Sequence, residues 1–255
     1  KFQNRLMNYG ICPLSIVPMR LEPADAAEMI NQVLYGEHFK VLEIRKKWSR
    51  IRLAHDKYEG WIDNKQYKEI TVEDYDAAQE RTPILASDLL QMATSSDEHV
   101  LSIPLGAQLA NLSLTGDHYE GNSVAEKREK ATFINTALLY LKSPYLWGGR
   151  TPFGLDCSGF TQMVYRLNGH SLFRDASQQA TQGEALSFIE ESEPGDLAFF
   201  DNDEGAIVHV GIMLQDNYII HCHGEVRIDR IDHTGIYNAE RRTHTHKLRV
   251  IKRIL

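Results

Sequence analysis

Residues 156–167 read Asp156-Cys157-Ser158-Gly159-Phe160-Thr161-Gln162-Met163-Val164-Tyr165-Arg166-Leu167. The apolar side chains of this stretch recur at helical spacing, which predicts an amphipathic helix. Asp156 suits the N-cap and Gly169 the C-terminal stop. Cys157 would then lie in the first turn, where backbone N–H groups and the helix dipole favour negative charge. We therefore predict a thiol of lowered pKa that acts as a nucleophile, rather than a buried structural cysteine.

The sequence around this helix predicts an α+β domain. Residues 131–142 have helical periodicity, and a second short helix is expected near Ser177. Strands are then expected at 196–200, 208–214, 217–222 and 248–255. Helices followed by strands indicate an antiparallel sheet.

The first half of the chain has a different texture. Residues 39–44 and 49–53 alternate between apolar and polar side chains, which is typical of half-buried strands. A shorter strand-rich stretch follows near residues 100–109, and the polar segment 117–130 reads as a linker. The spacing predicts two small β-barrels in tandem. The expected domains are 1–66, 67–125 (the second barrel with the linker) and 126–255.

Composition narrows the function classes. The chain has 255 residues, 42% of them hydrophobic, and a net charge of −7. This charge argues against non-specific binding to nucleic acid or to an anionic membrane. No apolar run approaches the roughly 20 residues needed to span a bilayer. Three cysteines give no disulfide framework. The chain starts at Lys1 rather than Met, which indicates a piece of a longer gene product.

Two histidines are candidates for the base and its orienting partner. His209 lies in the otherwise apolar segment 206–212, where a buried imidazole needs a hydrogen-bond partner or a catalytic role. His221 lies in the next expected strand, so a hairpin would bring the two rings together. Cys157, His209 and His221 would then form a nucleophile, a general base and an orienting residue.

Metal binding is the competing interpretation of the histidines. His221 and His223 point to one side of a strand, and cysteine and histidine are zinc ligands. The C-x-x-C and H-E-x-x-H spacings are absent from the sequence, so we predict no metal site and no cofactor. His244 and His246 repeat the spacing near the end of the chain, and we expect them to face solvent.

Six motifs in order resemble the NlpC-type cysteine peptidases, a papain-like family that cleaves bacterial cell-wall peptides. They are Tyr145-Leu146-Trp147-Gly148-Gly149, Leu155-Asp156-Cys157-Ser158-Gly159-Phe160, Arg174-Asp175-Ala176-Ser177-Gln178-Gln179, Pro194-Gly195-Asp196-Leu197-Ala198-Phe199-Phe200, Val208-His209-Val210-Gly211-Ile212 and Ile220-His221. The resemblance covers about the last half of the chain. It implies a Cys–His–His site that hydrolyses the bond between γ-D-glutamate and a diamino acid.

The first half is similar to bacterial SH3-like domains in 32–37 and 58–61. The whole arrangement resembles the dipeptidyl-peptidase branch, which acts on free murein peptides that carry an L-Ala amine. In that branch an SH3-like domain closes one end of the cleft. The substrate contacts that the resemblance implies are Asp156 and Tyr145 for the amine, Ser158 and Ser177 for D-glutamate, and Glu28 with Tyr58 from the first SH3-like domain.

Several alternatives stay open on the sequence alone. The chain could be an endopeptidase on intact murein, with the SH3-like domains as wall-binding modules. It could also be a non-catalytic wall-binding protein, or an acyltransferase that uses the same three residues. An envelope, periplasmic or secreted location would suit wall turnover, and a cytoplasmic one would suit the recycling of imported peptides. The partners expected are murein-derived peptides; the diamino acid and the oligomeric state are left open.

Overall fold

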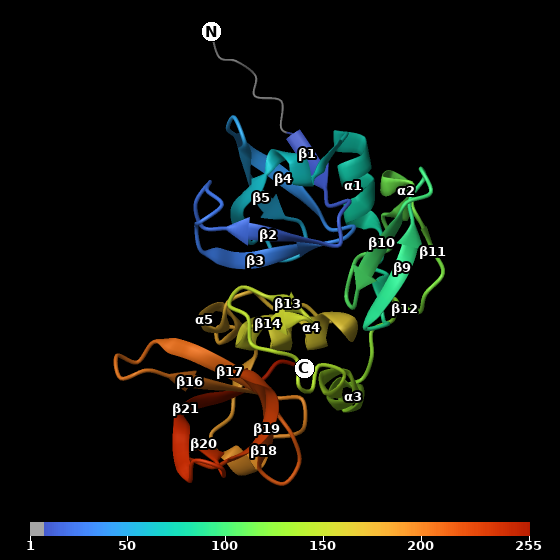
Figure 1. The fold of residues 1–255 in the computed structure, drawn as a ribbon. Helices are drawn as coiled ribbons and strands as arrows, with labels where there is room; N and C mark the ends of the chain where they lie inside the picture. Colours follow the sequence, from blue (N-terminus) through green and yellow to red (C-terminus); the bar gives the residue numbers. More distant parts are fainter. Residues whose placement is uncertain (1–7) are drawn as a thin grey trace. The chain divides into compact units, whose positions relative to one another are not determined.

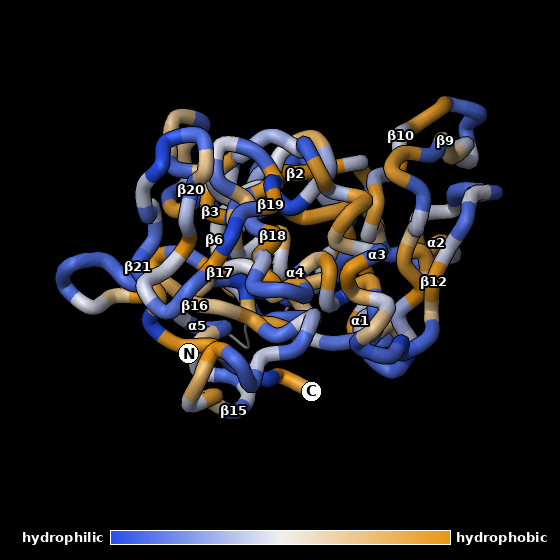
Figure 2. Tube along the Cα trace, turned by 90° about the horizontal axis from the view of Figure 1, so that it is seen from below, coloured by the Kyte–Doolittle hydropathy of each residue, from blue (hydrophilic) through white to orange (hydrophobic). Residues whose placement is uncertain are grey.

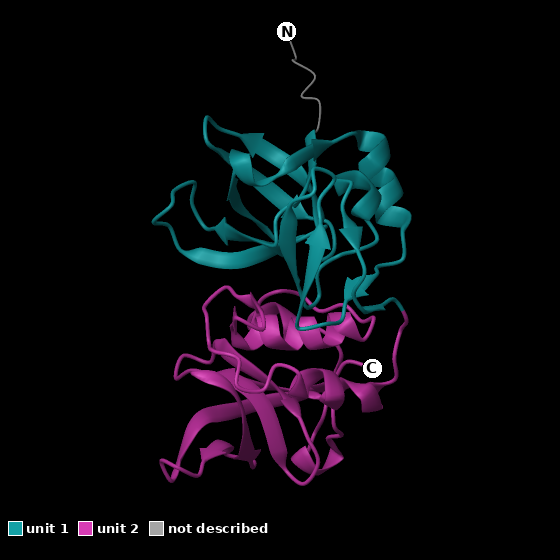
Figure 3. Ribbon diagram, turned by 45° about the vertical axis from the view of Figure 1, so that its right-hand side comes forward, with its two compact units in different colours: residues 1–125 teal, residues 126–255 magenta. Residues whose placement is uncertain are grey.

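The computed structural model describes residues 8–255, so the first seven residues of the predicted domain 1–66 lie outside the described part. The chain divides into two compact units, 1–125 and 126–255, drawn in separate colours in Figure 3. Each unit combines antiparallel sheets with short helices, as the predicted α+β class requires.

The first unit begins with a seven-stranded antiparallel sheet in the order β3-β2-β6-β5-β4-β1-β7. Its strands are β1 (Asn8–Ile11), β2 (Ile16–Arg20), β3 (Met29–Leu34), β4 (His38–Ile44), β5 (Trp48–Leu53), β6 (Glu59–Asp63) and β7 (Lys68–Ile70). The predicted strands at 39–44 and 49–53 are thus confirmed. Alternate side chains, among them Val17, Phe39 and Ile51, build a buried core within this barrel-like sheet.

The remainder of this unit is built from shorter elements. The 3-10 turn Asn64–Gln66 leads to β7, and α1 (Val72–Glu80) starts where the Thr71 hydroxyl accepts a hydrogen bond from the Asp74 N–H at 3.1 Å. The other elements are β8 (Leu85–Ala86), β9 (Leu90–Thr94), β10 (Val100–Pro104), α2 (Leu112–Thr115), β11 (His118–Tyr119) and β12 (Ser123–Val124). They form one three-stranded and one two-stranded sheet. The second SH3-like barrel stays a prediction.

The helices of the second unit are α3 (Phe133–Leu138), α4 (Cys157–Leu167) and α5 (Ala176–Gln179), with 3-10 turns at Lys130–Thr132 and Ile189–Glu191 (Figure 1). The helix expected over 131–142 is shorter than predicted. Residues 142 and 143, which follow the helix, bond to β19 instead. The Lys142 N–H donates to the Val226 carbonyl, and the Val226 N–H donates to the Ser143 carbonyl. These residues therefore pair with the sheet instead of continuing the helix.

The main sheet of the second unit closes on itself. Its order is β15-β21-β16-β17-β18-β19-β20, and β20 also pairs with β21. The strands are β15 (Glu184–Ala185), β16 (Leu197–Asp201), β17 (Ile207–Met213), β18 (Tyr218–His223), β19 (Glu225–Ile231), β20 (Gly235–Asn238) and β21 (Thr243–Arg253), and a separate hairpin joins β13 (Arg150–Thr151) to β14 (Gly154–Leu155). The four predicted strands are found, whereas β19 and β20 were not predicted.

The inner face of this closed sheet is apolar over much of its length. Each of the strands β16 to β21 contributes to one buried cluster, which includes Phe200, Met213 and Ile219. Figure 2 shows hydrophobic residues along the strands and hydrophilic ones in the projecting loops. Among the described helices, none combines the length and the apolar character needed to cross a membrane.

Candidate active site

The nucleophile predicted from the sequence stands at a helix start. Helix α4 begins at Cys157, and its N-cap Asp156 accepts a hydrogen bond from the Gly159 N–H at 2.7 Å. A Cβ atom at Gly159 would lie 2.2 Å from the Gly149 carbonyl oxygen. The close packing of the helix start on the preceding loop therefore requires glycine at position 159.

A buried ion pair fixes this helix start. Both terminal nitrogens of the Arg174 guanidinium donate to Asp156, at 2.9 and 2.7 Å. The Gly148 N–H donates to the same carboxylate at 2.8 Å. Arg174 also donates to the Ser158 hydroxyl at 3.0 Å. The pair is bidentate and buried, so it ties α4 to the segment before α5. Both oxygens of Asp156 thus already accept bonds from the protein.

Burial overturns one expectation for Cys157. The thiol is buried, and burial together with the neighbouring Asp156 carboxylate raises its pKa to about 12. Three groups act to lower the pKa of Cys157: the Ser158 N–H at the helix start, and the Val210 N–H and Arg174 from other segments. These groups are outweighed by desolvation. The prediction of a lowered pKa in the resting chain is therefore wrong.

Hydrogen bonds join His209 to His221, and join Cys157 to the residue after His209. The Val210 N–H bonded to the Cys157 sulfur belongs to β17, one residue after His209. His209 Nε2 lies 2.8 Å from His221 Nδ1, because β17 and β18 pair with Gly211 opposite His221. This bond occupies Nε2 of His209 and leaves Nδ1 as the nitrogen for the thiol proton.

The hydrogen-bonded line continues beyond His221. His221 Nε2 lies 2.9 Å from Asp229 Oδ2. Arg227 donates to both oxygens of Asp229, from Nε at 2.7 Å and from a terminal nitrogen at 3.0 Å. Burial acts to raise the pKa of Asp229, but the bonds from His221 and Arg227 outweigh it and hold the pKa at about 2. Asp229 is therefore a carboxylate at neutral pH.

The histidines form a cluster of four rather than two. His246 stacks on His209 with ring centroids 4.2 Å apart, and His223 lies 4.7 Å from His246 edge to face. The expectation that His246 faces solvent is wrong, since its ring is half-buried against the base. Burial and the neighbouring histidines lower its pKa to about 4. His244 instead bonds the exposed Asp232 at 2.9 Å.

The same effects keep the catalytic histidines neutral at pH 7. Burial and then repulsion from His221, His246 and His223 place the pKa of His209 well below its ordinary value. Burial also lowers the pKa of His221, although the Asp229 carboxylate opposes it.

Within residues 8–255, no group of three or more histidine, cysteine or acidic side chains has a geometry that could hold a metal ion.

The other predicted contacts of the catalytic unit differ in exposure. Tyr145 is partly exposed, and burial together with the nearby Cys157 and Asp156 raises the pKa of its hydroxyl, which places that hydroxyl beside the nucleophile. Ser158 is buried; its hydroxyl donates to Asp156 and accepts a hydrogen bond from Arg174. Ser177 is exposed inside α5, whose N-cap is Asp175, so Ser177 is not the helix cap.

The two contacts predicted from the first unit lie near its sheet. Glu28 is exposed and directly precedes β3; its carbonyl accepts a bond from the Leu21 N–H. Tyr58 packs partly buried against the core of the first unit, and its N–H donates to Asp56. Their part in substrate binding stays a prediction.

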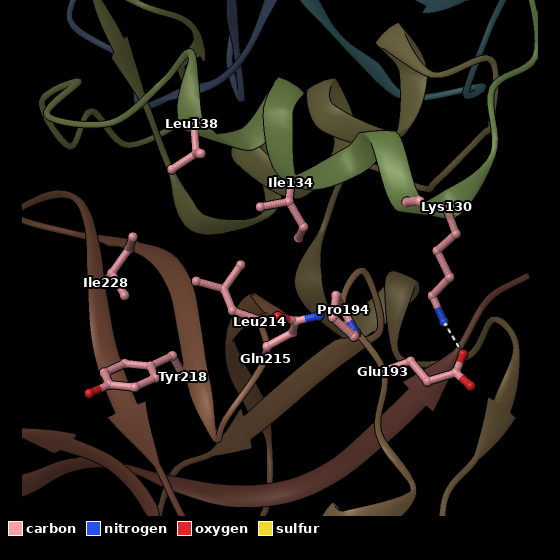
Figure 4. A pocket seen from close by; sticks show the side chains of 10 residues that line it. Lys130, Ile134, Leu138, Glu193, Pro194, Leu214, Gln215, Tyr218 and Ile228 are labelled. Atoms are coloured by element: carbon pink, nitrogen blue, oxygen red, sulfur yellow. Dashed lines mark hydrogen bonds and ion pairs between the residues drawn. The ribbon is translucent and has the colours of Figure 1, made fainter.

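A separate pocket of about 700 Å³ lies in the second unit (Figure 4). Figure 4 shows Ile134, Leu138, Leu214 and Ile228 pointing toward one another, with Lys130 paired to Glu193 at one end. Neither Cys157 nor His209 nor His221 is among the described residues that line this pocket. Catalysis is therefore assigned to the hydrogen-bonded line and not to this apolar hollow.

Two domain families match the chain. Residues 142–246 match the NlpC/P60 family, and the match spans Cys157, His209, His221 and His246. Residues 142–246 are an NlpC/P60 domain. Residues 19–66 match the bacterial dipeptidyl-peptidase SH3 domain, which confirms an SH3-like domain in the first unit.

Curated proteins and solved structures agree with this assignment. The chain is 27% identical over 248 residues to "Dipeptidyl-peptidase 6" of Lysinibacillus sphaericus, covering 83% of this chain and 87% of that protein. It is 38% identical over 107 residues to "Gamma-D-glutamyl-L-lysine dipeptidyl-peptidase" of Bacillus subtilis (strain 168), covering 40% of this chain and 36% of that protein. A Bacillus cereus NlpC/P60 family protein shares the fold, with a TM-score of 0.81, 19% identity and coverage of 97% and 99%.

Sequence reasoning missed three side chains of the NlpC/P60 site: Asp229, Arg227 and Arg174. Arg174 was recognised only as part of a family motif, yet it holds the helix start. Asp229 lies in a segment that alternates between apolar and charged residues, Glu225–Ile231. That alternation was the available sign of a strand beside the histidines.

Proposed function

We propose that this chain is a cysteine peptidase that hydrolyses murein peptides between γ-D-glutamate and the diamino acid. Its preferred substrates carry a free N-terminal L-Ala, and its product is L-Ala-γ-D-Glu. The observation that carries the proposal is the His209–His221 hydrogen bond, together with the bond from Cys157 to the residue after His209, within an NlpC/P60 domain. The bacterial dipeptidyl-peptidase SH3 domain in the same chain supports the preference for short peptides.

The first step forms a thioester. Because the resting pair is a thiol and a neutral imidazole, His209 Nδ1 takes the Cys157 proton as the sulfur attacks the γ-carbonyl carbon. The Cys157 N–H and the Tyr145 hydroxyl stabilise the oxyanion; losing one such donor costs about 10²–10³ in rate. When the C–N bond breaks, the His209 imidazolium gives its proton to the leaving amine.

The second step releases the dipeptide. His209 removes a proton from a water molecule as the water oxygen attacks the thioester carbon. The C–S bond then breaks, and the proton held on His209 returns to the sulfur of Cys157. The products are the free γ-carboxyl of D-glutamate and the regenerated thiol, so the cycle uses no cofactor.

The free amine of L-Ala needs a carboxylate and acceptor atoms when it leaves water. Asp156 and Tyr145 adjoin the nucleophile, and we assign the amine to them, with Ser158 and Ser177 toward D-glutamate. Because Arg174 and the Gly148 and Gly159 N–H groups already fill the acceptor sites of Asp156, this carboxylate would act on the amine through its charge, or through a bond that displaces one of these donors. Glu28 and Tyr58 are the proposed contributions of the SH3-like domain.

An endopeptidase on intact murein is the less favoured alternative. The relative that matches over most of this chain is named a dipeptidyl-peptidase. A non-catalytic wall-binding role is disfavoured because Cys157, His209 and His221 are all present and His209 is hydrogen-bonded to His221. Because the proposed substrates are murein peptides, the proposed place of action is related to the cell wall.

Mass spectrometry of products from L-Ala-γ-D-Glu-diaminopimelate and its lysine analogue tests the proposal. Cys157→Ala should abolish release of L-Ala-γ-D-Glu. Cys12→Ala removes another buried thiol from the first unit and should leave turnover unchanged. Undiminished hydrolysis by the Cys157→Ala variant would contradict the assignment of Cys157 as the nucleophile. An acetyl group on the L-Ala amine should block cleavage; if it does not, the dipeptidyl-peptidase preference fails and the endopeptidase alternative gains.

A further inference from the structure

The side of His221 that faces away from the base is held by a second ion pair. Asp229 and Arg227 lie on β19, directly across from β18, where Asp229 pairs with Ile219 and Arg227 with His221. Opposite residues of an antiparallel pair project to the same face. Ile219 belongs to the apolar core inside the closed sheet, so Asp229 also points inward, and it is buried.

The burial of a carboxylate among apolar side chains is costly unless the charge is paired and bonded. Asp229 meets this condition with three bonds: one to His221 at 2.9 Å, and two from Arg227 at 2.7 and 3.0 Å. Arg227 is itself 3.8 Å from the exposed carboxylate of Glu240. Arg227 therefore keeps Asp229 ionised and oriented with Oδ2 toward His221.

We propose that Asp229, held by Arg227, is a positioning residue that selects the nitrogen on which the base His209 accepts its proton. An ionised carboxylate only accepts hydrogen bonds, so His221 must carry its proton on Nε2. Nδ1 of His221 is then an acceptor, and His209 must donate to it from Nε2. The lone pair of His209 is thereby fixed on Nδ1, the nitrogen that the mechanism requires. This inference rests on the proposed function.

The alternative proton arrangement shows why the carboxylate matters. With the proton of His221 on Nδ1, His209 Nε2 would have to accept, and His209 would carry its proton on Nδ1. The base would then offer an N–H to the thiol and could not remove its proton. The charge of Asp229 disfavours this state and also stabilises the imidazolium that forms during attack.

Other titratable and charged groups also face the two rings. His223 comes from β18, His246 from β21, and Asp229 and Arg227 from β19. His223 and His246 lower the pKa of His209, whereas Asp229 is the group that acts to raise the pKa of His221. Removal of the Asp229 charge should therefore move the histidine-dependent limb of the pH–kcat/KM profile to lower pH.

The test compares Asp229→Ala and Asp229→Asn with the wild-type chain. The ring nitrogens of ¹⁵N-histidine-labelled protein report the tautomers by NMR without any substrate. Both rings should carry Nε2–H in the wild type, and the variants should show a mixture. We expect kcat to fall about 10- to 100-fold with little change in KM, the range seen when outer partners of metal-bound histidines are removed. Asp232→Asn, which breaks the exposed Asp232–His244 pair, is the matched control and should change neither readout.

The outcomes separate this inference from the proposed function. If Asp229→Ala does not fold, the isosteric Asp229→Asn decides, because it keeps the shape and loses the charge. Unchanged tautomers and an unchanged pH profile in a folded variant would overturn the positioning role, whatever the substrate proves to be. An altered tautomer in a chain that does not cleave murein peptides would instead retain the positioning role and reject the proposed substrate.

Discussion

The Cys157 thiol lies where a helix start favours its anion and where burial opposes it. The effect of burial outweighs that of the helix start, and the pKa of the thiol is raised to about 12. We therefore expect alkylation of Cys157 by iodoacetamide to be slow at pH 6 and to rise about tenfold for each pH unit through pH 9, since only the thiolate reacts. Mass spectrometry of the peptide that contains Cys157 measures this rate. A rate that is already constant below pH 7 would instead indicate a preformed thiolate–imidazolium pair.

At the residue scale the sequence was sufficient to place Cys157 at a helix start and to pair His209 with His221. The N-cap Asp156 and the apolar periodicity after it placed Cys157 correctly, and the hairpin expectation joined His209 to His221. The sign of the thiol pKa could not be predicted in this way. It depends on how completely β17 and the loop before α4 exclude water, which is a property of the packed domain.

At the element scale, strands β17, β18 and β21 bring together four imidazoles whose pKa values are all lowered. The pKa of His246 is lowered to about 4, and those of His209, His221 and His223 are lowered as well. Unfolded histidines bind protons near pH 6.5, whereas these folded ones do not. Between about pH 6.5 and pH 4 the unfolded state therefore binds more protons, and stability falls as the pH falls.

Thermal unfolding followed by circular dichroism at pH 7, 6, 5 and 4 measures this loss. The melting temperature should decrease across the interval, and His246→Phe, which keeps a flat ring on His209, should make the decrease smaller. His244→Phe is the matched control, because His244 is exposed and bonded to Asp232. An equal decrease in both variants and the wild type would contradict the assignment to His246.

The strands that prediction missed are also explained by packing at this scale. In β19, Ile228 is exposed whereas Asp229 is buried, which reverses the usual pattern of apolar inside and polar outside. An inward carboxylate is tolerated because Arg227 and His221 satisfy it. Likewise, His246 points inward because it pairs with Ile236, whose side chain belongs to the buried cluster. Neither arrangement can be inferred from local hydropathy.

At the scale of the whole molecule, the proposed preference for a free amine would use Glu28 of the SH3-like domain. Glu28→Gln should lower the ratio of kcat/KM for free and N-acetylated peptides by roughly tenfold, because a charge-assisted hydrogen bond contributes about 1.5–3 kcal/mol. Chromatographic assay of both peptides measures the ratio. Glu22→Gln, an exposed neighbour on the same unit, is the control. An unchanged ratio in the Glu28→Gln variant would remove Glu28 from the amine site.

The strand β21 also makes the closed sheet and the histidine cluster depend on a single segment. Its first half pairs with β20 and its second half with β16, so the sheet closes only when both halves are present. The same strand carries His246, whose ring stacks on His209. A chain cut before Thr243 would keep Cys157, His209 and His221 but lose the closure of the sheet and the ring beside His209, so we expect such a chain to be inactive.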